Sequence, residues 1–320
     1  NGFDPTWGGF GKAPKFPPSG NLLWLFQASR ILEDPSESEN AMHMAELTLE
    51  KMASGGMYDQ IGGGFARYSV DEYWRVPHFE KMLYDQGTLI SAYLEGWRTT
   101  GNPRFARIAS ECCDYLLRER QDPAGGFWSA TDADSEGEEG IFFAWTPKQL
   151  EEVLGEKRGK FATAFYGVSL AGTFEHGMSV LQVSLSALEA AEAAGIELLG
   201  SSNQQRRTAA EKLAQEVRSA LYEARLKRIP PNNDDKILTA WNGLAIHALA
   251  QAGRLLNQPT YTDAAARAAD FIMSELRKTK DAGNWTLYRS WRGGQAQHRA
   301  VLEDYAYFAR ALLSLFQSTG

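Results

Sequence analysis

The sequence has only two cysteines, no long apolar run and no excess of positive charge. Cys112 and Cys113 are adjacent, and because neighbours on a helix point about 100° apart, a disulfide between them is geometrically poor. Such cysteines are typical of small buried residues in a reducing compartment, which predicts a cytoplasmic protein. No run of about 18 apolar residues occurs, so the sequence predicts no membrane-spanning helix and no membrane partner.

Acidic residues outnumber basic ones, since 40 Asp and Glu against 33 Lys and Arg give a net charge of −7. This balance argues against nucleic acid or an anionic membrane as a partner. The 320 residues have room for two average domains or one large one, and because no long linker interrupts them we predict a single domain over 1–320. The chain begins without Met or a signal pattern, so we expect a piece of a longer protein or its ordered core.

Apolar residues recur mostly with the period of a helix. The spacing predicts one helix from residue 77 to 100 and a second from 103 to 117, separated by a turn at Gly101-Asn102-Pro103. The same pair recurs over 238–256 and 259–276, and a third start follows at 303–320. The sequence therefore predicts repeated helical hairpins.

Glycine positions support the repeat. Gly87 and Gly243 occupy equivalent positions in the two helices. Three turns that combine glycine with a bulky residue accompany the hairpins: Gly55-Gly-Met57, Gly125-Gly-Phe-Trp128 and Gly283-Asn-Trp285. Helical hairpins joined by such turns favour repeats that close on each other rather than separate domains.

The stretch from Asp132 to Pro231 is less regular. It opens with an acidic run around Asp134, continues with Ile141–Trp145, which we expect to form a short strand, and then predicts helices over 184–199 and 204–226. The acidic run resembles the start of a calcium loop, but position twelve would be Phe143 instead of Glu, so an EF-hand is excluded. An acidic rim is the favoured interpretation, a loose cation site the alternative, and no metal is predicted.

One segment gathers glycine, aromatic and ionisable residues before a helix, which indicates a pocket rim. We expect His78 and Asp85 to lie in the first turns of this helix, seven residues apart and therefore on one face. There His78 can transfer protons, with the carboxylate of Asp85 beside it. The alternative is that His78 only bonds backbone at the helix start. We expect five nearby residues to complete the site by contacting the substrate: Arg67, Tyr68, Trp74 and Glu80, with Asp134 on the acidic rim.

A second group of candidates precedes the repeated helix. Asp234 and Asp235 are catalytic candidates, and Lys236, Trp241 and Asn242 are binding candidates, because repeat-related helix starts converge at one end of a closed ring. Acids in a first turn are also explained by capping and by the helix dipole. His176 is a candidate second base opposite His78, unless it is a solvated loop residue, and His298 is another candidate partner. His43 and His247 are predicted to be structural.

Several long phrases together resemble one family, the YyaL / spermatogenesis-associated protein 20 family of thioredoxin-domain-containing proteins. They are Gly8–Pro17, Tyr58-Asp-Gln-Ile-Gly-Gly-Gly-Phe65, Val76-Pro-His-Phe-Glu-Lys-Met-Leu-Tyr-Asp85, Asp132–Gly140 and Asp234-Asp-Lys-Ile-Leu with Trp241-Asn-Gly243. The resemblance implies a thioredoxin-like domain, absent here, followed by an (α/α)6 toroid similar to N-acylglucosamine 2-epimerases and other six-hairpin sugar enzymes. The family pattern has His where this chain has Asn232, which puts a two-histidine mechanism in doubt.

These observations predict an all-α (α/α)6 toroid, complete or truncated, with short β hairpins at one end and a polar aromatic cavity. The first functional hypothesis is a sugar epimerase or isomerase that uses acid–base pairs. The second is a glycoside hydrolase with paired carboxylates, Asp134 or Glu139 against Asp234 or Asp235. The third is a non-catalytic module that serves the thioredoxin-like domain. A small-molecule ligand, in particular a sugar, is expected as partner, and no cofactor is predicted.

Overall fold

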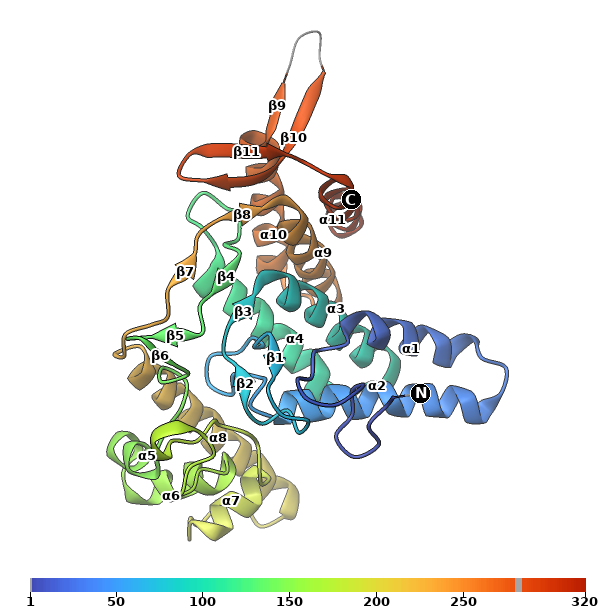
Figure 1. Cartoon of the computed structure of the whole chain (residues 1–320). Helices are drawn as coiled ribbons and strands as arrows, with labels where there is room; N and C mark the ends of the chain where they lie inside the picture. The colour runs from blue at the N-terminus through green and yellow to red at the C-terminus, as the bar shows by residue number, and fades with distance from the viewer. Residues whose placement is uncertain (1, 280–283) are drawn as a thin grey trace.

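A computed structural model describes residues 2–279 and 284–320 and shows helical hairpins arranged in an arc (Figure 1). Three hairpins follow one another, and a further long helix packs on the last of them. Their helices are α1 (Ser19–Ile31) with α2 (Pro35–Ser54), α3 (Leu83–Thr100) with α4 (Pro103–Tyr115), α9 (Thr239–Leu255) with α10 (Pro259–Phe271), and α11 (Leu302–Thr319). The predicted class, an all-α array of the (α/α)6 toroid type with short β hairpins, is confirmed.

Local sequence signals start and stop these helices. Pro35, Pro103 and Pro259 each occupy the first turn, where a missing N–H costs nothing. The Asp34 carboxylate accepts from the N–H of Ser36 at 2.8 Å, and the Asn102 side chain caps α4 in the same way. The hairpin turns are thus encoded locally.

The repeat predicted from the sequence recurs in the structure. The outer helices α4 and α10 each end in one π-helical turn, η1 (Leu116–Arg120) and η3 (Ile272–Leu276). The inner helices α3, α9 and α11 pack side by side. A Cβ on Gly87 would lie 2.8 Å from the backbone of Leu244 in α9, and a Cβ on Gly243 would lie 2.7 Å from the backbone of Tyr307 in α11. Glycine therefore sets the close approach of successive inner helices.

Two of the inner helices, α3 and α9, also hold the turn that follows the preceding hairpin. The buried Gln86 amide accepts from the N–H of Phe65 at 2.8 Å and donates to its carbonyl at 2.7 Å. Asn242 makes the same pair of hydrogen bonds with Phe127, at 2.8 and 2.9 Å. We call these two arrangements the amide clamps. The third predicted glycine turn begins at Gly283, which lies outside the described residues.

We expect Gly87→Ala to lower the free energy of unfolding by about 2 kcal/mol, because the added methyl group meets the α9 backbone and forces the helices apart. Urea denaturation measures the change. Gly20→Ala, in α1 and with no atom within 4 Å of the new Cβ, is the matched control and should raise stability slightly. Equal effects of the two substitutions would contradict the packing role of Gly87.

Short strands gather near the start of the inner helices (Figure 1). One sheet joins β3 (Lys81–Met82), β4 (Ala130–Thr131) and β7 (Asn233–Asp234), and β1 (Tyr68–Ser69) pairs with β2 (Pro77–His78). A second sheet places β10 (Trp285–Arg292) between β11 (Gln295–Arg299) and β8 (Ile237–Leu238), and β9 (Arg277–Thr279) also pairs with β10. The last pair is β5 (Asp134–Ser135) with β6 (Glu138–Glu139). These strands bring residues distant in sequence to one end of the array.

The irregular stretch forms a helical lobe with its own apolar cluster. Its helices are α5 (Pro147–Leu154), α6 (Glu156–Phe165), η2 (Glu175–Gly177), α7 (Ala187–Ala193) and α8 (Asn203–Arg225), shown in green and yellow in Figure 1. The expected strand over Ile141–Trp145 is wrong: these residues form a turn, and only Trp145 makes a β bridge, to Ser179. Arginines of α8 bind the loop that follows α2, since Arg218 donates to the Ile61 carbonyl at 2.9 Å and Arg225 pairs with Asp59 at 2.8 Å.

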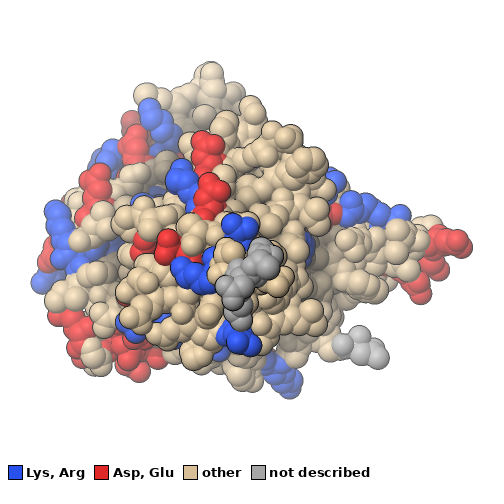
Figure 2. Space-filling view, turned by 90° about the horizontal axis from the view of Figure 1, so that it is seen from above, with Lys and Arg blue, Asp and Glu red and all other residues tan. Residues whose placement is uncertain are grey.

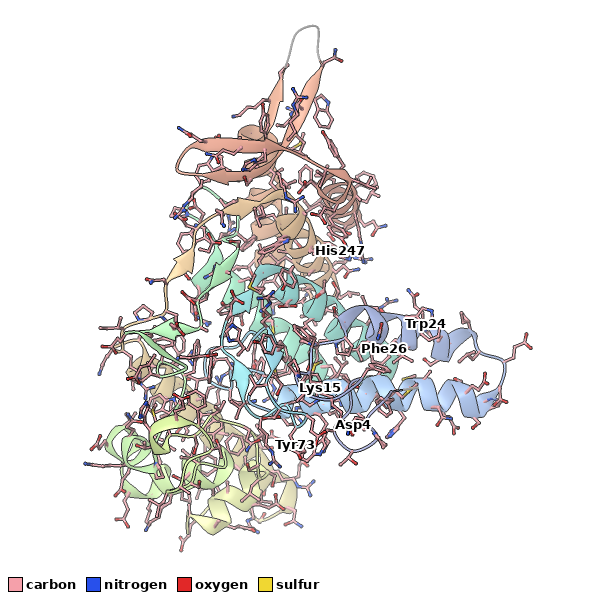
Figure 3. All side chains as sticks on the ribbon, in the orientation of Figure 1. Asp4, Lys15, Trp24, Phe26, Tyr73 and His247 are labelled. Atoms are coloured by element: carbon pink, nitrogen blue, oxygen red, sulfur yellow. The ribbon has the colours of Figure 1, made fainter. Side chains whose placement is uncertain are left out.

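Surface side chains differ along the arc. Acidic residues gather at the tip of the α1–α2 hairpin, at the right in Figure 2. On α1, Phe26 is buried whereas Trp24 is 64% exposed (Figure 3). Helix α11 likewise exposes Leu302, Leu313 and Phe316. Among the described residues, no helix is long and apolar enough to cross a membrane.

Candidate functional site

The site begins in a β hairpin and not in a helix. Helix α3 starts at Leu83, so the expectation that His78 and Glu80 lie in its first turns is wrong. His78 belongs to β2 and lies opposite Tyr68 of β1. The turn between these strands is held by Asp71, whose carboxylate accepts from the N–H of Tyr73 at 2.7 Å and of Val76 at 2.8 Å. Strand pairing, rather than helical spacing, therefore positions His78.

The His78 imidazole is held from two sides. Its Nδ1 lies 2.7 Å from a Glu139 oxygen, and its ring stacks on Tyr68 with 5.0 Å between ring centres. Its Nε2 lies 3.8 Å from Glu80. The predicted carboxylate partner of His78 was Asp85, whereas the structure provides Glu139 from β6 of the distant lobe. A carboxylate on Nδ1 orients the ring and leaves Nε2 for proton transfer.

Arg67 and Glu80 form the next layer of the site. The Arg67 guanidinium pairs with Glu80 at 2.9 Å, and the main-chain N–H of Arg67 donates to the Glu80 carbonyl at 2.8 Å. The Nε of Arg67 is buried and has no hydrogen-bond partner in the described structure. Tyr84 lies within hydrogen-bonding reach of Arg67. The ring of Tyr84 packs edge-on against Trp241 of α9, with 4.8 Å between ring centres.

Asp85 is the most unusual ionisable group of the site. Its Oδ2 is buried and has no hydrogen-bond partner in the part of the chain that the structure describes. Burial raises the pKa of Asp85 to about 8; the positive charge of Arg67 opposes this shift and the negative charge of Glu80 adds to it. The carboxyl group is therefore protonated at neutral pH and is able to donate a proton. The first turn of α3 fixes it beside Tyr84.

We call Arg67, Tyr68, His78, Glu80, Tyr84, Asp85, Glu139 and Trp241 the α3 site. The sequence analysis did not predict Glu139 and Tyr84 as members of this site. Tyr84 directly precedes Asp85 in the sequence, so an aromatic residue beside a candidate acid was the available signal. No local pattern pointed to Glu139 as the partner of His78, because 61 residues separate them.

The other predicted residues lie elsewhere or are already paired. Lys236 pairs with Asp234 at 3.1 Å, and Asp235 pairs with Arg292 at 2.6 Å. His176 lies in the exposed turn η2, 3.4 Å from Glu138. Asp134 is exposed in β5, in register with Glu139.

Two predicted binding residues are buried and hold the fold instead. Trp74 is fully buried, and its Nε1 donates to the Trp7 carbonyl at 2.8 Å. Asn242 is fully buried in the second amide clamp. Because both side chains are buried in the fold, the expectation that Trp74 and Asn242 contact a ligand is wrong. His247 is also buried, as expected; its Nδ1 lies 2.6 Å from the Ser314 hydroxyl, and burial lowers its pKa to about 4 (Figure 3). No group of metal-ligating side chains occurs within residues 2–279 and 284–320.

The arrangement defines an array of helical hairpins with an acid–base cluster at the start of one inner helix. Solved structures with a partial likeness include a family 76 glycoside hydrolase from Bacteroides thetaiotaomicron, 9% identical with a TM-score of 0.49 over 92% of this chain and 42% of that one. A cellobiose 2-epimerase from Bacillus thermoamylovorans is 15% identical, with a TM-score of 0.35 over 98% and 93% of the two chains. No family model matches the chain.

Sequence comparison identifies the particular relatives. Human spermatogenesis-associated protein 20 is 34% identical over 350 aligned residues, which cover 99% of this chain and 43% of that protein. An uncharacterized protein of Caenorhabditis elegans is 32% identical, over 99% of this chain and 46% of its own. The predicted resemblance to spermatogenesis-associated protein 20 is therefore confirmed. The chain spans less than half the length of these relatives.

Proposed function

We propose that the α3 site binds a small carbohydrate and moves protons on it. The observation that carries this proposal is Asp85, a carboxyl group whose pKa burial raises to about 8 and whose buried Oδ2 has no hydrogen-bond partner among the described residues. A fold gains nothing from such a group, because a buried polar atom without a partner costs free energy. Groups of this kind cluster at functional sites.

The neighbours of Asp85 suit a sugar. Tyr84 and Trp241 offer aromatic rings, and Arg67 and Glu80 offer charged groups for hydroxyl and carbonyl oxygens. In an epimerase or isomerase reaction, Nε2 of His78 takes the proton from the carbon beside the carbonyl. Asp85 gives its proton to the carbonyl oxygen, so that an enediol forms without a net change in charge of sugar and site together.

The test is an incubation of free monosaccharides, disaccharides and uronic acids with the protein in deuterium oxide. Proton abstraction places solvent deuterium on the carbon beside the carbonyl, which NMR detects. We expect Asp85→Asn to slow this exchange by about 10² to 10⁴-fold and His78→Asn to do likewise. The wild-type rate should fall above about pH 8, as Asp85 loses its proton. The matched control is Asp234→Asn, at a carboxylate already paired with Lys236. This variant should exchange deuterium at the wild-type rate.

A scaffold role is the second candidate, and one observation favours it. Most ionisable groups of the predicted site are engaged in pairs, namely Arg67 with Glu80, His78 with Glu139, and Lys236 with Asp234. If no sugar binds at millimolar concentration to the folded protein, the acid–base proposal fails and the scaffold proposal is favoured. Release of free sugar from a disaccharide, without deuterium exchange, would instead support the glycosidase alternative.

A further inference from the structure

A cavity separates the hairpin array from the helical lobe and lies apart from the α3 site. Its volume is about 350 Å³, within the range of small-molecule sites. Helix α4 supplies one wall, and α6, α8 and the start of α7 supply the other. Because the two walls come from separate parts of the sequence, the pocket exists only where the lobe docks on the array.

Positive charge is the main chemical feature of this cavity. Arg104 and Arg107, one turn apart on α4, both line it, and neither forms an ion pair within the described residues. Arg218 lines the opposite wall and is already paired with Glu111, which also accepts from the Tyr58 hydroxyl. The remaining lining carboxylate belongs to Glu211, an exposed residue of α8.

Arg104 has an unmet hydrogen-bonding requirement. One of its terminal nitrogens donates to the Ser54 hydroxyl at 2.7 Å, but its Nε is buried and has no partner in the described structure. Burial lowers the pKa of Arg104, and the neighbouring charge of Arg107 acts in the same direction. Two guanidinium groups that repel each other are stabilised by a shared oxyanion, which accepts hydrogen bonds from both.

The rest of the lining is largely apolar. Ile108 is buried beside the two arginines, and Phe165 and Leu185 face the cavity from the lobe. A ligand that fits this lining carries an oxyanion at one end and an apolar body at the other. Glu211, which lines the same cavity, disfavours a second negative charge on the ligand, so a carboxylate suits the site better than a phosphate monoester.

We propose that this cavity binds a small organic anion, with its oxyanion between Arg104 and Arg107 and its apolar body against Ile108 and Phe165. The site is a second ligand site, and its occupation links the lobe to the hairpin array. The proposal does not depend on the chemistry assigned to Asp85.

Calorimetric titration with three matched probes tests the proposal. The probes are phenylacetate, phenyl phosphate and the neutral phenylacetamide. We expect phenylacetate to bind best, phenyl phosphate more weakly, and phenylacetamide not at all. Arg107→Gln, at an exposed residue whose loss leaves the fold intact, should weaken phenylacetate binding about tenfold, and Arg104→Gln at least as much. Arg158→Gln, at an exposed arginine of α6 outside the cavity, is the control and should bind like the wild type.

Several outcomes would overturn the proposal. Equal affinity for phenylacetamide and phenylacetate would show that the site does not recognise the negative charge of the ligand. Loss of phenylacetate binding in Arg67→Gln, with Arg107→Gln unchanged, would place the anion at the α3 site. Absence of binding for all three probes to the folded wild-type protein would show that the cavity is not an anion site. By contrast, preference for phenyl phosphate would support the anion site and contradict only the role given to Glu211.

Discussion

Asp59→Asn is expected to lower the free energy of unfolding by about 3 to 5 kcal/mol, because it breaks a buried cluster of ion pairs. The Asp59 carboxylate forms ion pairs with Lys81 and Arg225, each at 2.8 Å, and all three side chains are at most 7% exposed. Burial by itself would raise the pKa of Asp59, but the two cations hold it well below its ordinary value. The amide would leave two buried positive charges without a counter-charge.

Urea denaturation with intrinsic tryptophan fluorescence measures the effect of Asp59→Asn. The matched control is Glu156→Gln, which removes an exposed partner of Lys160 and should leave the denaturation midpoint unchanged. If the two substitutions had similar effects, the buried cluster would not be what joins the lobe to the array. A separate early unfolding transition in Asp59→Asn would show that the lobe detaches first.

The second large effect is a loss of stability with rising pH that depends on Asp85. Its folded pKa, about 8, lies far above the value near 3.9 expected in the unfolded chain. Between these values the folded state binds more protons than the unfolded state, so the free energy of unfolding falls as pH rises. The loss should reach on the order of 5 kcal/mol by about pH 9, because each unit of pKa difference is worth about 1.4 kcal/mol.

Asp85→Asn should remove most of this pH dependence, because an amide does not titrate. Thermal unfolding of the two proteins between pH 4 and pH 9 measures the difference, and NMR of the Asp85 carboxyl carbon measures the pKa directly. Asp234→Asn is the control, since burial acts to raise the pKa of Asp234 but its hydrogen bonds, above all with Lys236, hold it below its ordinary value. A wild-type midpoint that is flat up to pH 9 would contradict the buried, protonated state of Asp85.

Helix positions and the repeat were predictable because they are encoded by short-range signals. Apolar spacing, the prolines that begin the hairpin helices and the pair Gly87 and Gly243 each act through neighbours in sequence or through one close contact. The family resemblance was predictable for the same reason, since it rests on contiguous phrases. Helix α11 was predicted from Glu303 and begins at Leu302.

The site was predicted only in part, because strand pairing and lobe docking decide it. Apolar spacing placed His78 at the start of a helix, whereas the pairing of β2 with β1 holds it against Tyr68. The partner of His78, Glu139, belongs to the acidic run at the start of the irregular stretch. No local pattern specifies which acidic residue of this run contacts His78. The sequence also did not reveal which side chains are buried. Trp74 was predicted to bind a ligand because it is an aromatic residue near His78, but it is fully buried.

The amide clamps give the array a direction of assembly. Gln86 can fix the turn at Phe65 only after α3 has formed, and Asn242 can fix the turn at Phe127 only after α9 has formed. Each hairpin is therefore completed by its successor, so cooperativity passes along the chain from one hairpin to the one before it. Hydrogen exchange would reveal this as a graded protection pattern, in which loosening α9 exposes the amide of Phe127 while the amide of Phe65 stays protected.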